Sequence, residues 1–99
     1  MAIAEISVVP LGTKTASVSQ YVARAIKVLE REGAIRYEMT AMGTIVEGDL
    51  NRILELVKRM HEETFGEGVV RVLTTVKIDD RRDKTQGMKA KVESLQKKL

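Results

Sequence analysis

Residues 37–49, which read YEMTAMGTIVEGD, decide the fold. Short apolar runs lie on either side of the tripeptide 41–43, and they predict two strands, over 35–40 and 44–47, that fold back on each other. We expect Gly43 to take a positive φ in the turn, because it has no side chain to oppose one. The resulting hairpin divides the chain into two halves, each with one amphipathic helix and one apolar strand.

Alternating residues predict two longer strands, one over 2–9 and one over 69–78. Pro10 should end the first strand, because it has no N–H to give to a ladder. The sets expected to face the core are Ala4, Ile6 and Val8 in the first strand, and Val70, Val72, Thr74, Val76 and Ile78 in the second. The opposite sets mix apolar and polar residues: Ile3, Glu5, Ser7 and Val9, and Val69, Arg71, Leu73, Thr75 and Lys77.

Apolar residues at helical spacing predict a helix on each side of the hairpin. The first begins at Ser17, which forms a capping box with Gln20, and ends at Gly33. The second begins after Asp49, a favourable N-cap residue. The predicted core stripes are Val18, Tyr21, Val22, Ala25, Ile26 and Leu29, and Leu50, Ile53, Leu54, Val57, Met60 and His61.

The resulting order, β-α-β-β-α-β, is that of the ferredoxin-like fold, an α+β sandwich with two helices on a four-stranded antiparallel sheet. We expect all 99 residues to form one domain. Residues 1–78 would make its core, and 79–99 would add a charged turn and a C-terminal helix. That helix has a narrow apolar stripe and must pack on its own domain or on a neighbour. The stripe is Met88, Val92, Leu95 and Leu99.

Two helices cover only one face of such a sheet. The mixed set on the other face is too apolar for an open surface and too polar for a core, so we expect something to cover it. A second copy of the chain is the simplest partner, which would give a homodimer or homotetramer. The alternative is that the C-terminal helix folds back over this face in the same subunit.

Composition argues against several classes of partner. The chain has no cysteine, no apolar run long enough to span a membrane and no basic segment of a secretory signal, so we expect a cytoplasmic protein. The net charge of +3 lies in residues 79–99, because residues 1–78 carry 10 basic and 10 acidic side chains. The two long strands lack the aromatic residues on which RNA-binding members of this fold stack bases. We therefore expect neither a nucleic-acid nor a membrane partner.

No motif predicts an enzyme. His61 is the only histidine, and no Asp, Glu and His set has metal-ligand spacing. Glycine-rich phosphate loops are missing. The acylphosphatase activity found on this fold needs an arginine in the first loop, where residues 10–16 offer only Lys14 as a cation. We expect no catalytic residue, no metal and no required cofactor.

The hairpin remains as the candidate binding site. It combines an aromatic ring, hydroxyls, carboxylates and thioethers, and small-molecule sites join a few such polar groups to an apolar wall. The candidates are Tyr37, Glu38, Met39, Thr40, Met42, Thr44 and Glu47. Each also has an ordinary interpretation: the tyrosine as a core or interface aromatic, the threonines as strand formers and the carboxylates as solvated strand positions.

Four runs resemble the thiamine-binding-protein-like family: residues 8–12, the helix start at 17–19, the hairpin 40–48, and 76–84. The resemblance covers nearly the whole chain. It implies a β-α-β-β-α-β fold assembled into dimers and often tetramers, with sheets meeting across the interface. It also implies non-catalytic binding of thiamine or its hydroxymethyl-pyrimidine half, which we expect near the hairpin 37–49 at a subunit interface. The alternative is a structural or regulatory homo-oligomer whose ligand, if any, is another small molecule or an anion.

An aminopyrimidine ring suits these residues chemically. We expect Tyr37 and Met42 to wall the ring and Thr40 and Thr44 to hydrogen-bond its edge. Glu47, or else Glu38, would accept a hydrogen bond from the ring nitrogen or the amino group. Secondary candidates from the adjoining strands and helix start are Ser7, Ser17 and Lys77.

Arg81 and Arg82 also belong to a run that carries the resemblance. Asp79, Asp80 and Asp83 surround them. We expect ion pairs that fix a strand end or an interface in preference to a ligand site.

Overall fold

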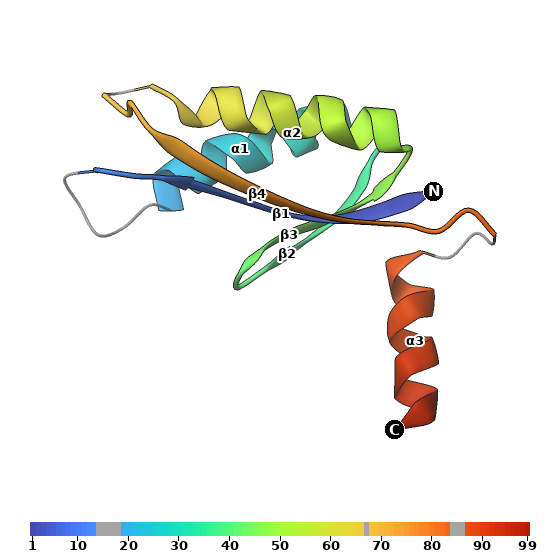
Figure 1. Cartoon of the computed structure of the whole chain (residues 1–99). Coiled ribbons are helices and arrows are strands. Elements are labelled where there is room, and N and C mark those ends of the chain that lie inside the picture. Colours follow the sequence, from blue (N-terminus) through green and yellow to red (C-terminus); the bar gives the residue numbers. More distant parts are fainter. Residues whose placement is uncertain (14–18, 67, 84–86) are drawn as a thin grey trace.

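The structure is a computed structural model that describes residues 1–13, 19–66, 68–83 and 87–99. Its elements, in chain order, are β1 (Ala2–Pro10), α1 (Ser19–Glu32), β2 (Arg36–Thr40), β3 (Gly43–Gly48), α2 (Leu50–Thr64), β4 (Val72–Asp80) and α3 (Met88–Lys98). Figure 1 shows α1 and α2 together on one face of the sheet and α3 on the other side. The predicted α+β, ferredoxin-like fold is confirmed.

The sheet has the strand order β2-β3-β1-β4, with every neighbouring pair antiparallel. β1 pairs with β4 along its whole length, as far as Pro10 opposite Val72. It pairs with β3 only as far as Ile6 opposite Thr44. Residues 7–10 of β1 therefore extend beyond the start of β3.

The helix-covered face of β1 is the predicted one, since Ala4, Ile6 and Val8 are all buried. The predicted stripe of α2 is partly wrong: Leu54 is 46% exposed, whereas Leu56 is completely buried. Both leucines lie one turn or less from buried Ile53, so helical spacing alone does not decide between them. The second helix thus faces the sheet with Ile53, Leu56, Met60 and Thr64.

β4 begins and ends later than predicted. Val70, expected in the core, precedes the strand and is 86% exposed. Asp79 and Asp80, expected in a charged turn, form the last two residues of β4. The pairing with β1 sets both ends, because a strand stops where its partner stops offering backbone groups.

The hairpin turn also differs from the prediction. Thr40 pairs with Gly43, so the loop is the dipeptide Ala41 and Met42. Gly43 does not have a positive φ. It is needed for a different reason: a Cβ there would lie 2.8 Å from the carbonyl oxygen of Ile6 on β1.

The predicted end of the first helix and the predicted start of the second are confirmed. Gly33 follows α1 with a φ of 68°, and its N–H donates to the carbonyl of Leu29. Asp49 caps α2, with its side chain accepting from the N–H of Arg52 at 3.3 Å. The predicted capping residue Ser17 lies outside the described residues.

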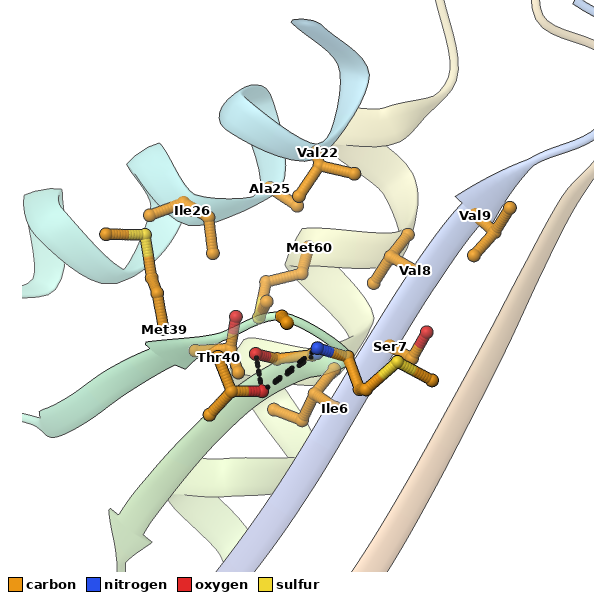
Figure 2. Close-up of a pocket in the computed structure, with 14 residues that line it drawn as sticks. Ile6, Ser7, Val8, Val9, Val22, Ala25, Ile26, Met39, Thr40 and Met60 are labelled. Atoms are coloured by element: carbon orange, nitrogen blue, oxygen red, sulfur yellow. Dashed lines mark hydrogen bonds between the residues drawn. The ribbon is translucent and has the colours of Figure 1, made fainter. Parts of the chain in front are cut away.

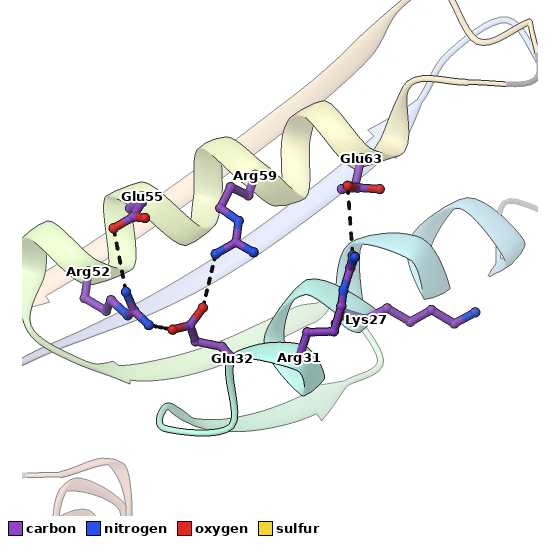
Figure 3. Close-up of polar contacts among 7 residues, drawn as sticks. All are labelled: Lys27, Arg31, Glu32, Arg52, Glu55, Arg59 and Glu63. Carbon is purple, nitrogen blue, oxygen red and sulfur yellow. Dashed lines mark hydrogen bonds and ion pairs between the residues drawn. The ribbon is translucent and has the colours of Figure 1, made fainter.

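Charged side chains join α1 to α2 along their outer surface (Figure 3). Glu32, at the end of α1, lies between Arg52 and Arg59 of α2 and forms ion pairs with both. The Glu32 side chain is mostly buried, whereas both groups of the longer Arg31–Glu63 pair are more than half exposed. The Glu32 cluster thus ties the end of α1 to α2.

α3 leaves most of the open face of the sheet uncovered (Figure 1). None of its residues, all of which the structure describes, is buried. It is held at its first turn, where Glu47 accepts from the N–H of Met88, and by an ion pair between Lys91 and Asp79. The fold-back of the C-terminal helix over this face, considered from the sequence, does not occur in this chain.

Candidate functional site

A pocket of about 240 Å³ lies between the tip of the hairpin, the end of β1 and helix α1 (Figure 2). β1 contributes Ile6 and Val8, α1 contributes Val22 and Ile26, and the hairpin contributes residues 39–44. The pocket exists because β3 starts at Gly43 while β1 continues. No β3 residue fills the space beside the end of β1, and α1 covers that space from above.

The hydroxyl of Thr40 is fully used inside the turn. It donates to the carbonyl of Gly43 at 2.9 Å and accepts from the N–H groups of Met42 and Gly43 at 3.2 and 3.1 Å. A hydroxyl has one proton and two lone pairs, so these three bonds exhaust it. Thr40 therefore shapes the pocket and has no hydrogen bond left for a ligand.

Two methionines from the hairpin flank the pocket. Met39 reaches towards Ile26 of α1 in Figure 2, and Met42 is 82% exposed in the turn. Methionine side chains are unbranched and flexible, so they adapt to irregular shapes. The lining is therefore mainly apolar, with Ser7 and the buried Thr44 adding hydroxyl-bearing side chains.

The hairpin places its predicted residues on opposite faces of the sheet. Tyr37 lies opposite Val46 on the helix-covered face and packs against the core. Glu38 lies opposite Ile45, on the open face. Lys77 is also on the open face, exposed and opposite Glu5.

Of the predicted ligand residues, the pocket brings together Ser7, Thr40, Met42 and Thr44. Four other predicted residues do not line it: Tyr37, Glu38, Glu47 and Lys77. Ser17 lies outside the described part of the chain. Sequence reasoning missed the wall that α1 supplies and, at the end of β1, Val8 and Val9, since both depend on tertiary contacts. The one available signal was alternation: Met39 shares a face with Tyr37 and Thr44.

Glu47 has structural partners on the open face. Its side chain is only 6% exposed, and Oε1 lies 3.3 Å from Nε of Arg36. Oε2 accepts from the N–H of Met88 at 2.9 Å. A Cβ on Gly87 would lie 2.8 Å from this oxygen, so the chain comes this close only with glycine there. The residue thereby links the hairpin to α3.

A second, more open groove of about 360 Å³ runs between the sheet and α3. Glu38 and Ile45 form its sheet side, and α3 contributes the other side from Met88 to Gln96. It places Glu38, one of the predicted carboxylates, beside the apolar side chains of Ile45, Met88 and Val92. It does not join the hairpin pocket, with which it shares no lining residue among those described.

His61, the candidate general base by residue type, forms no catalytic arrangement with the other described residues. His61 Nδ1 lies 2.6 Å from the hydroxyl of Thr74, and its ring meets Phe65 edge-on at 5.4 Å. These residues join α2 to β4, away from the pocket lining. Among the described residues, no group of three or more His, Asp and Glu could hold a metal ion.

The charged run after β4 forms the ion pairs expected from the sequence. Arg81 pairs with Asp83, and Arg82 pairs with Asp80. The hydrogen bond to Asp83 raises the pKa of Arg81, and that to Asp80 raises the pKa of Arg82. All four groups are close in sequence, so these pairs organise the chain locally after the strand.

None of the described helices has the length and apolar character needed to cross a membrane.

Comparison with known proteins identifies relatives over nearly the whole chain. A family model described as "Thiamine-binding protein" matches residues 4–96. The UPF0045 protein YqgV of Bacillus subtilis is 45% identical, with 100% of this chain and 98% of the relative aligned. A UPF0045 protein of Methanothermobacter thermautotrophicus is 47% identical over 100% of both chains. Among solved structures, the hypothetical protein MJ1052 from Methanocaldococcus jannaschii superimposes with a TM-score of 0.87 at 41% identity, covering 96% of this chain and 95% of that one.

Proposed function

Because this chain belongs to the thiamine-binding protein family, we propose that it is a non-catalytic small-molecule binding protein whose ligand is thiamine or its hydroxymethyl-pyrimidine half. The observation that carries the proposal is the hairpin pocket, which lies within the family-matched residues. Its lining joins an apolar wall to a few polar groups, as ligand sites do.

The size of the pocket favours the pyrimidine half. Ligand sites for drug-sized molecules usually occupy roughly 300–1,000 Å³, and this pocket, at about 240 Å³, is smaller. A single substituted ring would fill it. The thiazolium ring of thiamine would then extend past the exposed Met42 towards solvent or a second subunit.

The lining suits a flat, weakly polar ring. Val22 and Ile26 of α1 offer an apolar surface, and Met39 and Met42 offer polarisable sulfur. Thr44, the remaining hairpin hydroxyl of the predicted set, lies at the base of the turn. The proposal thus keeps the hairpin as the site and transfers the wall of the ring from Tyr37 to α1.

Calorimetry tests this function directly. Hydroxymethyl-pyrimidine and thiamine are titrated separately into the full chain, to millimolar ligand. The proposal expects saturable heat with one site per chain, and the pyrimidine half should bind nearly as well as thiamine. An absence of heat with both ligands contradicts the proposal. Mass spectrometry of small molecules released from the freshly purified protein is the independent check.

A second candidate function is a structural or regulatory homo-oligomer. The observation in its favour is exposed apolar surface on the open side of the sheet. Leu73 of β4 is 56% exposed, and Val92 and Leu95 of α3 are exposed to a similar degree. Isolated apolar residues are normal on surfaces, but a face that combines them with an uncovered sheet suits a second copy of the chain.

Sedimentation at micromolar concentration tests this candidate. We expect a dimer or tetramer that Leu73→Lys dissociates, because a charge would be buried in the apolar contact. Val70→Lys is the matched control, since Val70 is exposed outside the sheet. A wild-type chain that sediments as a monomer contradicts the oligomer.

A further inference from the structure

We propose that the backbone of Val8, at the open edge of β1, is the group that recognises the aminopyrimidine. Its carbonyl accepts from the exocyclic amino group, and its N–H donates to the adjacent ring nitrogen. This inference rests on the proposed function, because it assigns the polar contacts of that ligand within the hairpin pocket. It makes a main-chain group, and no side chain, the determinant of specificity.

The direction of the backbone groups follows from the ladder. In an antiparallel pair, successive residues of a strand direct their N–H and C=O groups alternately to the two neighbouring strands. The N–H of Leu11 donates to the carbonyl of Arg71, in line with β4. Odd-numbered residues at this end of β1 therefore point to β4, and even-numbered residues point to the other side. The carbonyl of Ile6, which closely faces Gly43 of β3, agrees with this assignment.

Val8 is the next even-numbered residue, and β3 has ended before reaching it. Continuing the register, the residue opposite Val8 would be Met42, but Met42 lies in the turn. No pairing is found for Val8 on this edge among the residues that the structure describes. Pro10, the following even-numbered residue, has no N–H. Within β1, Val8 is thus the residue beyond the β3 ladder that can direct both a donor and an acceptor to this side, where it lines the pocket.

An aminopyrimidine has the complementary edge. In a hydrogen-bonded antiparallel pair, one residue exchanges both its N–H and its C=O with the single residue opposite. The amino group beside a ring nitrogen likewise offers one donor next to one acceptor. The ring would extend the sheet in place of the missing strand residue, with one of its faces against Val22 and Ile26 of α1. The hydroxyl of Thr40 is already used in the turn and leaves this role to the backbone.

Hydrogen exchange at single amides is the first test. In the ligand-free protein, we expect the Val8 amide to exchange much faster than those of Ile6 and Leu11, which are held in ladders. Saturating hydroxymethyl-pyrimidine should slow exchange at Val8 by at least about tenfold and shift its amide proton downfield, while Leu11 stays unchanged. Strong protection of Val8 without ligand would overturn the inference, because the edge would then be already paired.

An analogue with an oxo group in place of the amino group is the second test. This change turns the donor into an acceptor, and the adjacent ring nitrogen then carries a proton, so both bonds to Val8 become repulsive. Calorimetry should show a loss of affinity of about 100-fold or more. The same substitution should matter little if only apolar walls hold the ring.

The outcomes separate the two proposals. If hydroxymethyl-pyrimidine binds, but Val8 exchange is unaffected and the oxo analogue binds equally well, the inference is wrong and the proposed function stands. If neither hydroxymethyl-pyrimidine nor thiamine produces heat, both fail. Binding with Val8 protection and rejection of the oxo analogue supports both.

Discussion

The carboxylate of Glu47 accepts a hydrogen bond from the backbone N–H of Met88 at 2.9 Å, although 41 positions separate the two residues. This contact joins the return strand of the hairpin to the first turn of α3. The N-cap residue, Gly87, provides no side-chain hydrogen bond of its own. A carboxylate from elsewhere in the fold thus satisfies a free N–H at this helix end, where negative charge is favoured.

Replacing Glu47 with alanine should loosen α3 and lower the free energy of unfolding by about 1–3 kcal/mol, because the part-buried N–H of Met88 loses a charged acceptor. Amide exchange should accelerate from Met88 onwards. Glu5→Ala, on the neighbouring strand β1 and exposed, is the control and should leave α3 unchanged, because Glu5 does not line the groove beside α3.

Ligand affinity gives this variant a second use. We expect Glu47→Ala to bind hydroxymethyl-pyrimidine as the wild type does, because Glu47 does not line the hairpin pocket. If affinity falls strongly while α3 exchange is unchanged, Glu47 is a ligand residue as the sequence suggested.

Gly43→Ala should destabilise the fold by about 1–3 kcal/mol, because the added methyl group would lie 2.8 Å from the carbonyl oxygen of Ile6. Relief of this clash requires the tip of the hairpin to move away from β1, which also deforms the pocket. Urea unfolding is the measurement. Gly48→Ala is the control on the same strand, since its nearest neighbour, Ile35, is at an ordinary 3.8 Å. Equal stability of the two variants would contradict the close approach.

Glu32→Gln should cost more stability than Glu63→Gln. Glu32 is largely buried between Arg52 and Arg59, and losing its charge leaves two guanidinium groups beside each other. We expect a loss of about 1–3 kcal/mol, in the range for hydrogen bonds to charged groups. The Arg31–Glu63 pair is long, at 3.9 Å, and exposed, so its loss should hardly change the free energy of unfolding. Similar urea midpoints for the two variants would show that the Glu32 cluster stabilises the fold no more than the Arg31–Glu63 pair does.

Much of the fold could be predicted because its signals are local. The alternation around Ile6 and the spacing around Ile53 follow from which side chains face water. The start of β4 at Val72 and the burial of Leu56 over Leu54 depend on the register between elements. Sequence patterns do not contain that register, because several pairings bury equally apolar residues.

The candidate site could be predicted less completely. Part of the predicted hairpin set lines the pocket, but adjacent residues of a strand point to opposite faces, so Tyr37 and Glu38 cannot line one pocket together. The contribution of Val22 depends on how α1 crosses the sheet. That the backbone of Val8 is unpaired on the β3 side, among the described residues, depends on where β3 begins. Almost every residue type carries the same backbone N–H and C=O groups, so the amino-acid type at this position does not predict their role.

Calorimetry with a pocket-filling variant tests the central claim, that the hairpin pocket holds an aminopyrimidine. Val22→Phe places an aromatic ring in the pocket from α1, and Val70→Phe makes the same substitution at a site that is 86% exposed and away from it. With hydroxymethyl-pyrimidine as ligand, we predict saturable heat for the wild type and for Val70→Phe, and none for Val22→Phe, provided that all three show the same fold by circular dichroism. Undiminished binding to Val22→Phe, or no binding to the wild type, would contradict the claim.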